Sequence, residues 1–387
     1  MRYSSGEACR QFFLTIRTKC SIASPIIPNE TKVIYSAAPA LGHHNHRVPS
    51  LCISEKNVTG FAHFRGSDII QLDNIRTATM EEITSVHSRS YVSSLEEIMA
   101  WAKDWRHGVL EFEGTGPSYV TTKTLEVAVV SVGTGLSVID SIVAASKLNV
   151  YTPIGFALIR PPGNHAAPNA VFPMGYCVFN NIAIAARYAQ CVHGLERVFI
   201  IDFDVFHGNG TNDAFYDDPD VFFLSVHQDG GYPRDMGKID DIGYGNGEGT
   251  TINLALPERS GDIAMQSVFN EVIAPAAQRF KPDIILVSAG YDGHVRDPLG
   301  NFQMTTGGYY TLSSNIKHLA KDVCGGRCVF FLEGGYFLNA LANSVVESFR
   351  GFVGEPSMGP DYNYNFFLDD EPSVIDVIQR IKHLHSL

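Results

Sequence analysis

Several polar side chains stand directly after short hydrophobic runs, at the points where the chain would leave a buried strand. They are His165, Asp202, Asp204, Asp292 and Tyr336. A single aspartate in such a place is usually a helix cap or a turn residue. Here such side chains follow four different strands, which indicates an active or metal-binding site instead. Carboxylates, an imidazole and a phenol together can bind a metal ion or transfer protons.

The hydrophobic runs before these residues are mostly continuous and rich in Val, Ile and Phe, which is typical of strands covered on both faces. The expected strands are Lys32–Ala40, Ile154–Ile159, Val198–Val205, Val221–Val226, Ile284–Ser288 and Cys328–Leu332. Helical patterns alternate with them, at about residues 122–147, 180–193, 262–280, 306–322 and 339–352. We expect a C-terminal cap at Gly194 and an N-terminal cap at Asp262.

This alternation predicts an α/β fold, a mostly parallel sheet with helices on both faces. In such a sheet, active and ligand-binding sites usually lie at the carboxyl ends of the strands. The sequence has no internal repeat and no low-complexity linker, so we interpret residues 25–387 as one domain.

The charge and the hydropathy limit the classes of partner. The formal net charge is −12, which argues against broad electrostatic binding to nucleic acid. No stretch reaches the roughly 18 uninterrupted apolar residues that suggest a membrane span. We therefore expect neither direct nucleic-acid binding nor membrane insertion, and the oligomeric state stays open.

The first 24 residues differ from the rest of the chain. Their basic residues are Arg2, Arg10, Arg17 and Lys19, against the single acid Glu7. With several Ser and Thr and an apolar side, this is the balance of an organellar transit peptide, which predicts a plastid or a mitochondrion. The alternative is a disordered basic tail, which would leave the protein in the cytoplasm.

Four ordered motifs carry a resemblance to a known family. They read Gly-Phe-Ala-Leu-Ile-Arg-Pro-Pro-Gly from residue 155, Ile-Asp-Phe-Asp-Val from 201, His-Gly-Asn-Gly-Thr from 207 and Ser-Ala-Gly-Tyr-Asp from 288. From about residue 32 to 354 the chain resembles the histone deacetylase and acetylpolyamine amidohydrolase family, on the arginase-like α/β fold. It looks especially like the plant organelle-type deacetylases.

The resemblance implies a role for each matching residue. The family holds zinc through Asp, His and Asp, and this metal polarises the acetyl carbonyl and activates water. By position, the zinc-binding aspartates are Asp204 and Asp292, and the oxyanion-stabilising tyrosine is Tyr336. The proton-handling His pair falls on Asn164 and His165.

Other family positions imply a substrate pocket and a second metal site. The expected pocket residues are Gly175, Tyr176, Tyr232 and Phe206, the two tyrosines matching the aromatic walls of the acyl-lysine tunnel. Asp202 matches the carboxylate that supports the first residue of the His pair. Together with Ser225 and backbone carbonyls it also matches the family's structural potassium site. The rim loop over residues 166–174 is longer than the family's usual link.

Two positions depart from the family pattern. The histidine that should bind zinc is Phe206, which has no lone pair to donate, and the neighbouring His207 should point away from the metal. The first residue of the His pair is Asn164, whose amide cannot take up a proton near pH 7. We therefore expect zinc to be absent or weakly bound. Asp204 and Asp292 should then share a proton or recruit another cation, because like charges at short range raise one pKa.

Three functions fit this pattern. The first is a repurposed, metal-independent enzyme that does acid/base chemistry on a small molecule, such as one containing an amine. The second is a non-catalytic protein that binds an acylated ligand or a partner through the old tunnel. The third is a residual metal-dependent deacetylase of acetyl-lysine or acetylated small amines.

Overall fold

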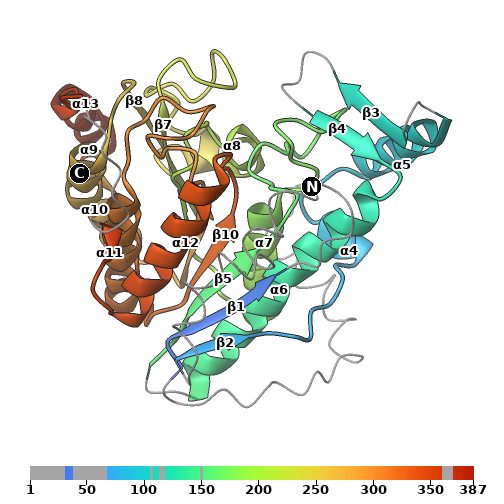
Figure 1. Cartoon of the computed structure of the whole chain (residues 1–387), viewed down its shortest axis with the longest axis horizontal. Coiled ribbons are helices and arrows are strands. Elements are labelled where there is room, and N and C mark those ends of the chain that lie inside the picture. Colours follow the sequence, from blue (N-terminus) through green and yellow to red (C-terminus); the bar gives the residue numbers. More distant parts are fainter. Residues whose placement is uncertain (1–30, 38–67, 105–107, 113–117, 149–150, 360–368) are drawn as a thin grey trace.

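The structure, a computed structural model, describes most of the chain (Figure 1). It covers residues 31–37, 68–104, 108–112, 118–148, 151–359 and 369–387. The predicted transit segment, residues 1–24, lies outside the described residues.

In the described part of the chain, eight strands form one central sheet in the order β2-β1-β5-β10-β9-β6-β7-β8. Their bounds are β1 Val33–Ala37, β2 Ile69–Gln71, β5 Ile154–Leu158, β6 Val198–Asp202, β7 Val221–Gln228, β8 Thr251–Leu256, β9 Ile284–Ala289 and β10 Cys328–Leu332. Every neighbouring pair in this sheet is parallel. All carboxyl ends therefore lie at the same edge, as predicted.

Helices cover both faces of the sheet (Figure 1). The described helices are α4 Met80–Ile83, α5 Arg89–Asp104, α6 Thr124–Leu148, α7 Asn181–His193, α8 Asn209–Phe215, α9 Asp262–Val268, α10 Ala274–Phe280, α11 Thr306–Cys324, α12 Leu338–Val353 and α13 Ile375–His385. Successive residues of a strand point to opposite faces. Accordingly Phe330 packs in a core with residues of α9 to α13, and Phe331 packs in a second core with residues of α4 to α8.

The predicted helices all occur, with small differences at their ends, and the one predicted over 262–280 runs through α9, a π-helical turn at Phe269–Ile273 and α10. Gly194 ends α7 in a left-handed conformation, with φ 69°, as predicted. The predicted cap at Asp262 is wrong, because Gly261 precedes α9 and Asp262 is its first helical residue. The Asp262 carboxylate instead accepts hydrogen bonds from the backbone N and Oγ1 of Thr305, at 2.9 and 2.6 Å. An acid suits the first turn of a helix as well as the cap position, so the sequence pattern did not separate the two.

The predicted strands also occur, most of them with ends shifted by one to three residues, and residues 38–40 of the first predicted strand lie outside the described residues. The run predicted as Val198–Val205 leaves the sheet after Asp202, and β7 continues to Gln228. Several elements were not among the expected strands and helices: β2, β8, the antiparallel hairpin of β3 (Val109–Phe112) and β4 (Ser118–Thr121), and helices α4, α5, α8 and α13.

Among the described residues, α6 is the helix whose length and hydropathy would allow it to span a membrane. It is long and apolar enough to cross one by length and composition, with a hydropathy of 1.9 over its best window. However, 83% of that window is buried inside the protein, where α6 packs against α7 and β5. This burial is what a core helix shows.

Candidate active site

The four strand ends that carry the predicted site residues are neighbours in the sheet. Strands β5, β10, β9 and β6 lie side by side in that order. The loop after β5 carries Asn164 and His165, β10 leads to Tyr336, β9 leads to Asp292, and β6 leads to Asp204. Residues far apart in the sequence thus meet at one edge of the sheet, as predicted.

The carboxyl groups of Asp204 and Asp292 lie against the backbone of Gly334. The Gly334 N donates to Asp204 Oδ2 at 2.8 Å, and a Cβ built on Gly334 would lie 1.8 Å from Asp292 Oδ2. Asp204 Oδ1 accepts from the Phe206 N at 3.0 Å, and Asp292 Oδ1 accepts from the Val205 N at 3.1 Å. Backbone groups therefore hold both carboxyl groups in place, and only glycine at position 334 permits this approach.

Both carboxyl groups have a raised pKa. Burial is the largest cause for each, since a low-dielectric interior disfavours the charged form. The negative charge of Asp204 raises the pKa of Asp292 further, well above its usual value. His165 acts in the opposite direction on the pKa of Asp204. The prediction concerned the effect of like charge on one member of the pair, and that effect is the second cause, after burial, of the raised pKa of Asp292.

His165 is buried and has a defined orientation. Its Nδ1 lies 2.9 Å from the amide oxygen Oδ1 of Asn209. Because a carboxamide oxygen only accepts, Nδ1 carries the proton and Nε2 keeps its lone pair. A Cβ built on Gly175 would lie 2.4 Å from His165 Cδ2, so glycine is required at position 175 to make room for the ring. Burial lowers the pKa of His165, while the Asp204 charge raises it.

Asn164 takes part in the site as a hydrogen-bond donor. Its Nδ2 donates to Asp202 Oδ2 at 3.2 Å, and Asp202 Oδ1 accepts from the Asp204 N at 3.0 Å. Asp202 thus lies beside Asn164, as the resemblance implied. The amide of Asn164 can hold Asp202 in place, but it cannot relay a proton.

The predicted pocket residues Phe206, Tyr232 and Tyr176 lie in two separate aromatic groups. Half-buried Phe206 packs edge to face on Tyr232 with ring centroids 6.2 Å apart, and Tyr232 packs edge to face on His165 at 5.2 Å. Tyr176 and Tyr336 form the other group, at 5.8 Å. The ring of Phe206 is therefore part of an aromatic group that includes the catalytic candidate His165.

His207 belongs to a different cluster. Its ring lies 4.7 Å from that of His227 and 6.3 Å from that of Phe223, both on β7. Burial lowers the pKa of His207 to about 2, so its imidazole is neutral. His207 packs against the sheet, as the alternation of side chains at a strand end predicted.

The structure adds two functional candidates that sequence reasoning missed. Buried Glu333 accepts hydrogen bonds from the Gly163 N at 2.7 Å, the Asn164 N at 3.3 Å and Ser288 Oγ at 3.1 Å. It therefore fixes the loop that carries Asn164 and His165. Asn209, the second candidate, orients His165. The sequence could have identified both as site residues, because Glu333 directly follows a predicted strand and Asn209 lies in the His-Gly-Asn-Gly-Thr motif.

The potassium site stays a prediction. Asp202 and Ser225 face each other in register across β6 and β7, and Ser225 Oγ lies 2.9 Å from His227 Nδ1. Across the residues that the structure describes, no three His, Cys, Asp or Glu side chains are grouped so that they could hold a metal ion.

Comparisons with known proteins agree with this architecture. The family model "Histone deacetylase domain" matches residues 54–352. "Histone deacetylase 14, chloroplastic" from Arabidopsis thaliana is 54% identical over 95% of this chain and 90% of that protein. "Histone deacetylase 10, chloroplastic" from Oryza sativa is 53% identical over 92% of this chain and 82% of that protein. Both names support plastid localisation, one of the two predicted organelles.

A solved structure supports the fold independently. The crystal structure of the HDA15 HD domain superposes with a TM-score of 0.73 and 26% sequence identity, covering 92% of this chain and 94% of that one. From the family model, these relatives and the shared parallel sheet we conclude that the chain belongs to the histone deacetylase family and has its single-domain, arginase/deacetylase-like fold.

Proposed function

We propose that this chain is a repurposed enzyme on the deacetylase scaffold, which works without zinc and does acid/base chemistry on a small amine-containing molecule. The observation that carries the proposal is Phe206. A catalytic zinc site needs three protein donors, and here the position between the two aspartates is a phenyl ring that packs on Tyr232. The remaining pair, Asp204 and Asp292, supplies two, so the donor set does not fit a catalytic zinc.

The carboxyl pair supports a role in moving protons. Asp292 Oδ2 is buried and receives no hydrogen bond in the described part of the chain. This oxygen and Asp204 Oδ2 lie against the same Gly334, so a single proton held between the two carboxyl groups would satisfy both. Such a pair can donate a proton to a substrate and take it back.

His165 supports the complementary role of a base. With Nδ1 occupied by Asn209, its lone pair is on Nε2. The pKa of His165 is lowered mainly by burial, which favours the neutral imidazole that accepts protons. Asn164 cannot share this work, so the proposed reaction uses one imidazole and one carboxyl pair.

The lining of the pocket supports an amine as substrate. Phe206 and Tyr232 present aromatic rings beside the carboxyl groups, and aromatic faces together with carboxylates favour an organic cation. The human relative named "Polyamine deacetylase HDAC10", 35% identical over 73% of this chain, acts on amines by its name. A charged or protonated amine is therefore the substrate class that we expect.

The similarity to chloroplastic deacetylases favours a second candidate, a residual metal-dependent deacetylase. The two candidate functions differ in whether the protein binds zinc and needs it for activity. Metal content of the purified full chain, measured by mass spectrometry, should be well below one zinc per chain in the wild type and should rise in Phe206→His. Phe206→Leu is the matched control, since it changes the ring without adding a donor.

Activity measurements separate the candidates further. We expect no hydrolysis of an acetyl-lysine reporter, weak hydroxamate binding, and turnover of an amine from a metabolite extract that persists with a chelator and is lost in Asp292→Asn. Stoichiometric zinc with chelator-sensitive reporter hydrolysis would establish the residual deacetylase and overturn the proposal. Retention of an acylated ligand without any turnover would overturn it in favour of a non-catalytic binder.

A further inference from the structure

Asp297 joins two of the loops that form the candidate active site. It lies in the loop after β9, beyond Asp292, and it is buried, with 8% of its surface exposed. Its Oδ2 accepts hydrogen bonds from the Tyr336 N at 2.6 Å and the Phe337 N at 3.2 Å, both in the loop after β10. Its Oδ1 accepts from the Leu299 N at 3.0 Å. One carboxyl group therefore holds both loops at the same point.

The loop that carries Asp297 is itself fixed. The Asp297 N donates to the His294 O at 2.7 Å, and the Val295 N donates to the Met304 O at 2.9 Å. The buried ring of His294 places its Nε2 3.1 Å from Oγ1 of Thr306, the first residue of α11. Asp297 therefore holds the neighbouring loop from a rigid support.

The segment that carries Tyr336 needs such an anchor. Gly334 and Gly335 stand directly before Tyr336, and glycine restricts the backbone less than any other residue. Gly335 has φ 125°, a conformation that residues with side chains rarely adopt. Asp204 Oδ2 holds the Gly334 N at 2.8 Å, and Asp297 holds the Tyr336 N. The two carboxyl groups thus fix both ends of a short and intrinsically flexible link.

Two ring contacts complete the attachment of this segment. The guanidinium carbon of exposed Arg296 lies 4.7 Å from the ring centroid of Phe337, a cation–π contact between the same two loops. The ring of Tyr336 packs against that of Tyr176, at 5.8 Å. The loop after β9 therefore sets the backbone of Tyr336, and the pocket wall sets its ring.

We propose that Asp297 is a positioning residue, which holds Tyr336 at the carboxyl pair so that the phenol can hydrogen-bond to a bound substrate. Asp297 itself is not the group that contacts the substrate, because its oxygens accept the backbone N–H groups of Leu299, Tyr336 and Phe337. The catalytic part of this role rests on the function proposed above, whereas the attachment of Tyr336 to Asp297 does not.

Fluorine NMR of the full chain, labelled with fluorotyrosine, tests the attachment. The Tyr336 resonance is the one missing from Tyr336→Phe. Asp297→Asn keeps one acceptor oxygen and cannot serve both loops. We expect the Tyr336 resonance to shift or broaden, and the amides of Tyr336 and Phe337 to exchange at least about 10-fold faster. Should this variant not fold, Arg296→Ala, at an exposed position, should shift the same resonance by less. An unchanged resonance with unchanged exchange would overturn the positioning role.

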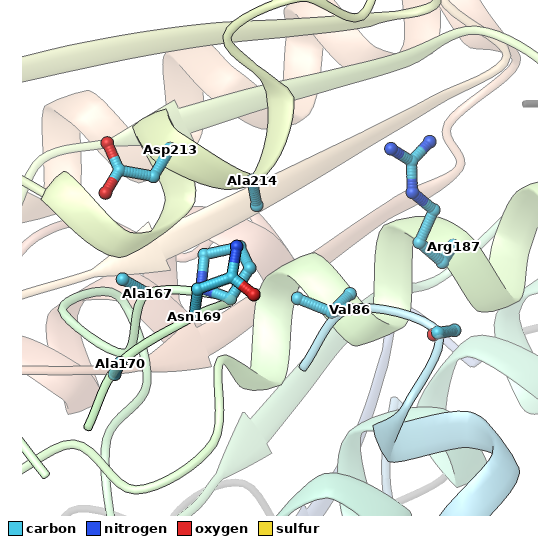
Figure 2. A pocket seen from close by; sticks show the side chains of 9 residues that line it. Val86, Ala167, Asn169, Ala170, Arg187, Asp213 and Ala214 are labelled. Carbon is cyan, nitrogen blue, oxygen red and sulfur yellow. The ribbon is translucent and has the colours of Figure 1, made fainter. Parts of the chain in front are cut away.

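Asp218→Asn is the matched control. Asp218 is as deeply buried as Asp297, and it pairs with Arg187 at 2.6 Å. It precedes β7, at the opposite edge of the sheet from the site, and Arg187 lines a separate cavity between α7 and α8 (Figure 2). This variant should lose stability without changing the Tyr336 resonance. A change as large as that in Asp297→Asn would show a general loosening of the fold and refute the attachment.

Kinetics test whether Asp297 acts through Tyr336. With the amine substrate of the proposed reaction, Asp297→Asn should lower kcat at least about 10-fold and change KM little. In a Tyr336→Phe background the same substitution should cost less than about 2-fold, because the group that it positions is gone. Losses that multiply in full would overturn the positioning role. A wild type that turns over no amine would count against the proposed function, and the NMR and exchange measurements would then decide the attachment on their own.

Discussion

Gly334 and Asp292 are in closer contact than any side chain at position 334 would permit. A Cβ on Gly334 would lie 1.8 Å from Asp292 Oδ2 and 2.6 Å from Asp204 Oδ2. The loop after β10 therefore forms one wall of the carboxyl pair that follows β6 and β9. Its backbone sets how closely Asp204 and Asp292 approach each other.

Gly334→Ala should therefore disrupt the carboxyl pair. The added methyl group must displace Asp292 or the loop, at a cost of about 1–3 kcal/mol in the free energy of unfolding. Urea unfolding measures this loss, and turnover should disappear. Gly307→Ala on α11, whose added Cβ would meet nothing closer than 3.5 Å, is the control and should be neutral or stabilising. Equal stability of the two variants would contradict the contact.

The double variant Asn164→His, Phe206→His should recover deacetylase chemistry. It restores both the third zinc donor and the second imidazole, and so returns both departures to the family pattern. Hydrolysis of an acetyl-lysine reporter, inhibited by a chelator, is the measurement. The single variant Phe206→His should bind zinc but hydrolyse the reporter at least about 100-fold more slowly than the double variant, the lower end of what one acid–base group contributes. Zinc uptake by Asn164→His alone would point to a different metal site.

Removing the partner of His165 should lower activity more than stability. Asn209→Ala leaves the buried Nδ1 of His165 without its acceptor, which costs about 1–3 kcal/mol in unfolding free energy. The ring also loses its fixed tautomer, so kcat should fall while KM changes little. Asn315→Ala, which removes a hydrogen bond to Gln266 on the surface of α11, controls for loss of an amide.

Glu333 should prove to be a positioning residue for the loop that carries His165. Glu333→Gln keeps an acceptor for the Gly163 N and places its amide at Ser288 Oγ, which can accept as well as donate. Glu333→Ala leaves two backbone N–H groups of that loop unpaired, so it should destabilise by about 2–4 kcal/mol more than Glu333→Gln. Activity should follow the same order, and equal losses would argue against the positioning role.

The stability of the protein should fall in mild acid through His87. This buried imidazole accepts a hydrogen bond from the Asn180 N at 2.8 Å, and burial lowers its pKa from 6.5 to about 4. The unfolded chain therefore binds the proton more readily than the folded one. The stabilisation is complete above pH 6.5, decreases as the pH falls and is lost by about pH 4, about 3 kcal/mol in all.

His87→Gln isolates this contribution, since glutamine can accept the same hydrogen bond but does not titrate. The difference in unfolding free energy between the variant and the wild type should change with pH between 6.5 and 4. Comparing the two cancels the effect of other buried histidines such as His227, whose pKa burial also lowers. A difference that does not vary with pH would exclude His87 as the source.

The sequence predicted the parallel sheet and the gathering of site residues because both depend on long, continuous patterns. The six predicted strands are hydrophobic enough to be recognised individually, and parallel strands leave their polar ends at one edge. Three-residue β2 and four-residue α4 are too short to carry a periodicity. Helix α5 was missed although its buried residues Tyr91, Leu95 and Ile98 recur at helical spacing, so the sequence did carry a signal for it.

Details within the site could not be predicted, because they depend on contacts across the fold. The hydrogen bonds from Gly163 and Asn164 to Glu333 join residues about 170 positions apart. Likewise, the cavity between α7, α8, the loop after His165 and the residues that follow α4 arises from the packing of four segments. The motifs indicated candidate residues for the site, whereas the contacts between their atoms depend on the tertiary packing.

The placement of the reacting groups on separate neighbouring strands has an evolutionary consequence. Each strand is held by its own backbone hydrogen bonds, so a side chain at one strand end can be exchanged while the other groups keep their positions. On the proposal made above, Phe206 is such an exchange, and the register of β6 with its neighbours β7 and β9 is regular. A lineage could therefore pass from one type of reaction to another by single substitutions at this edge, without first having to acquire a new scaffold.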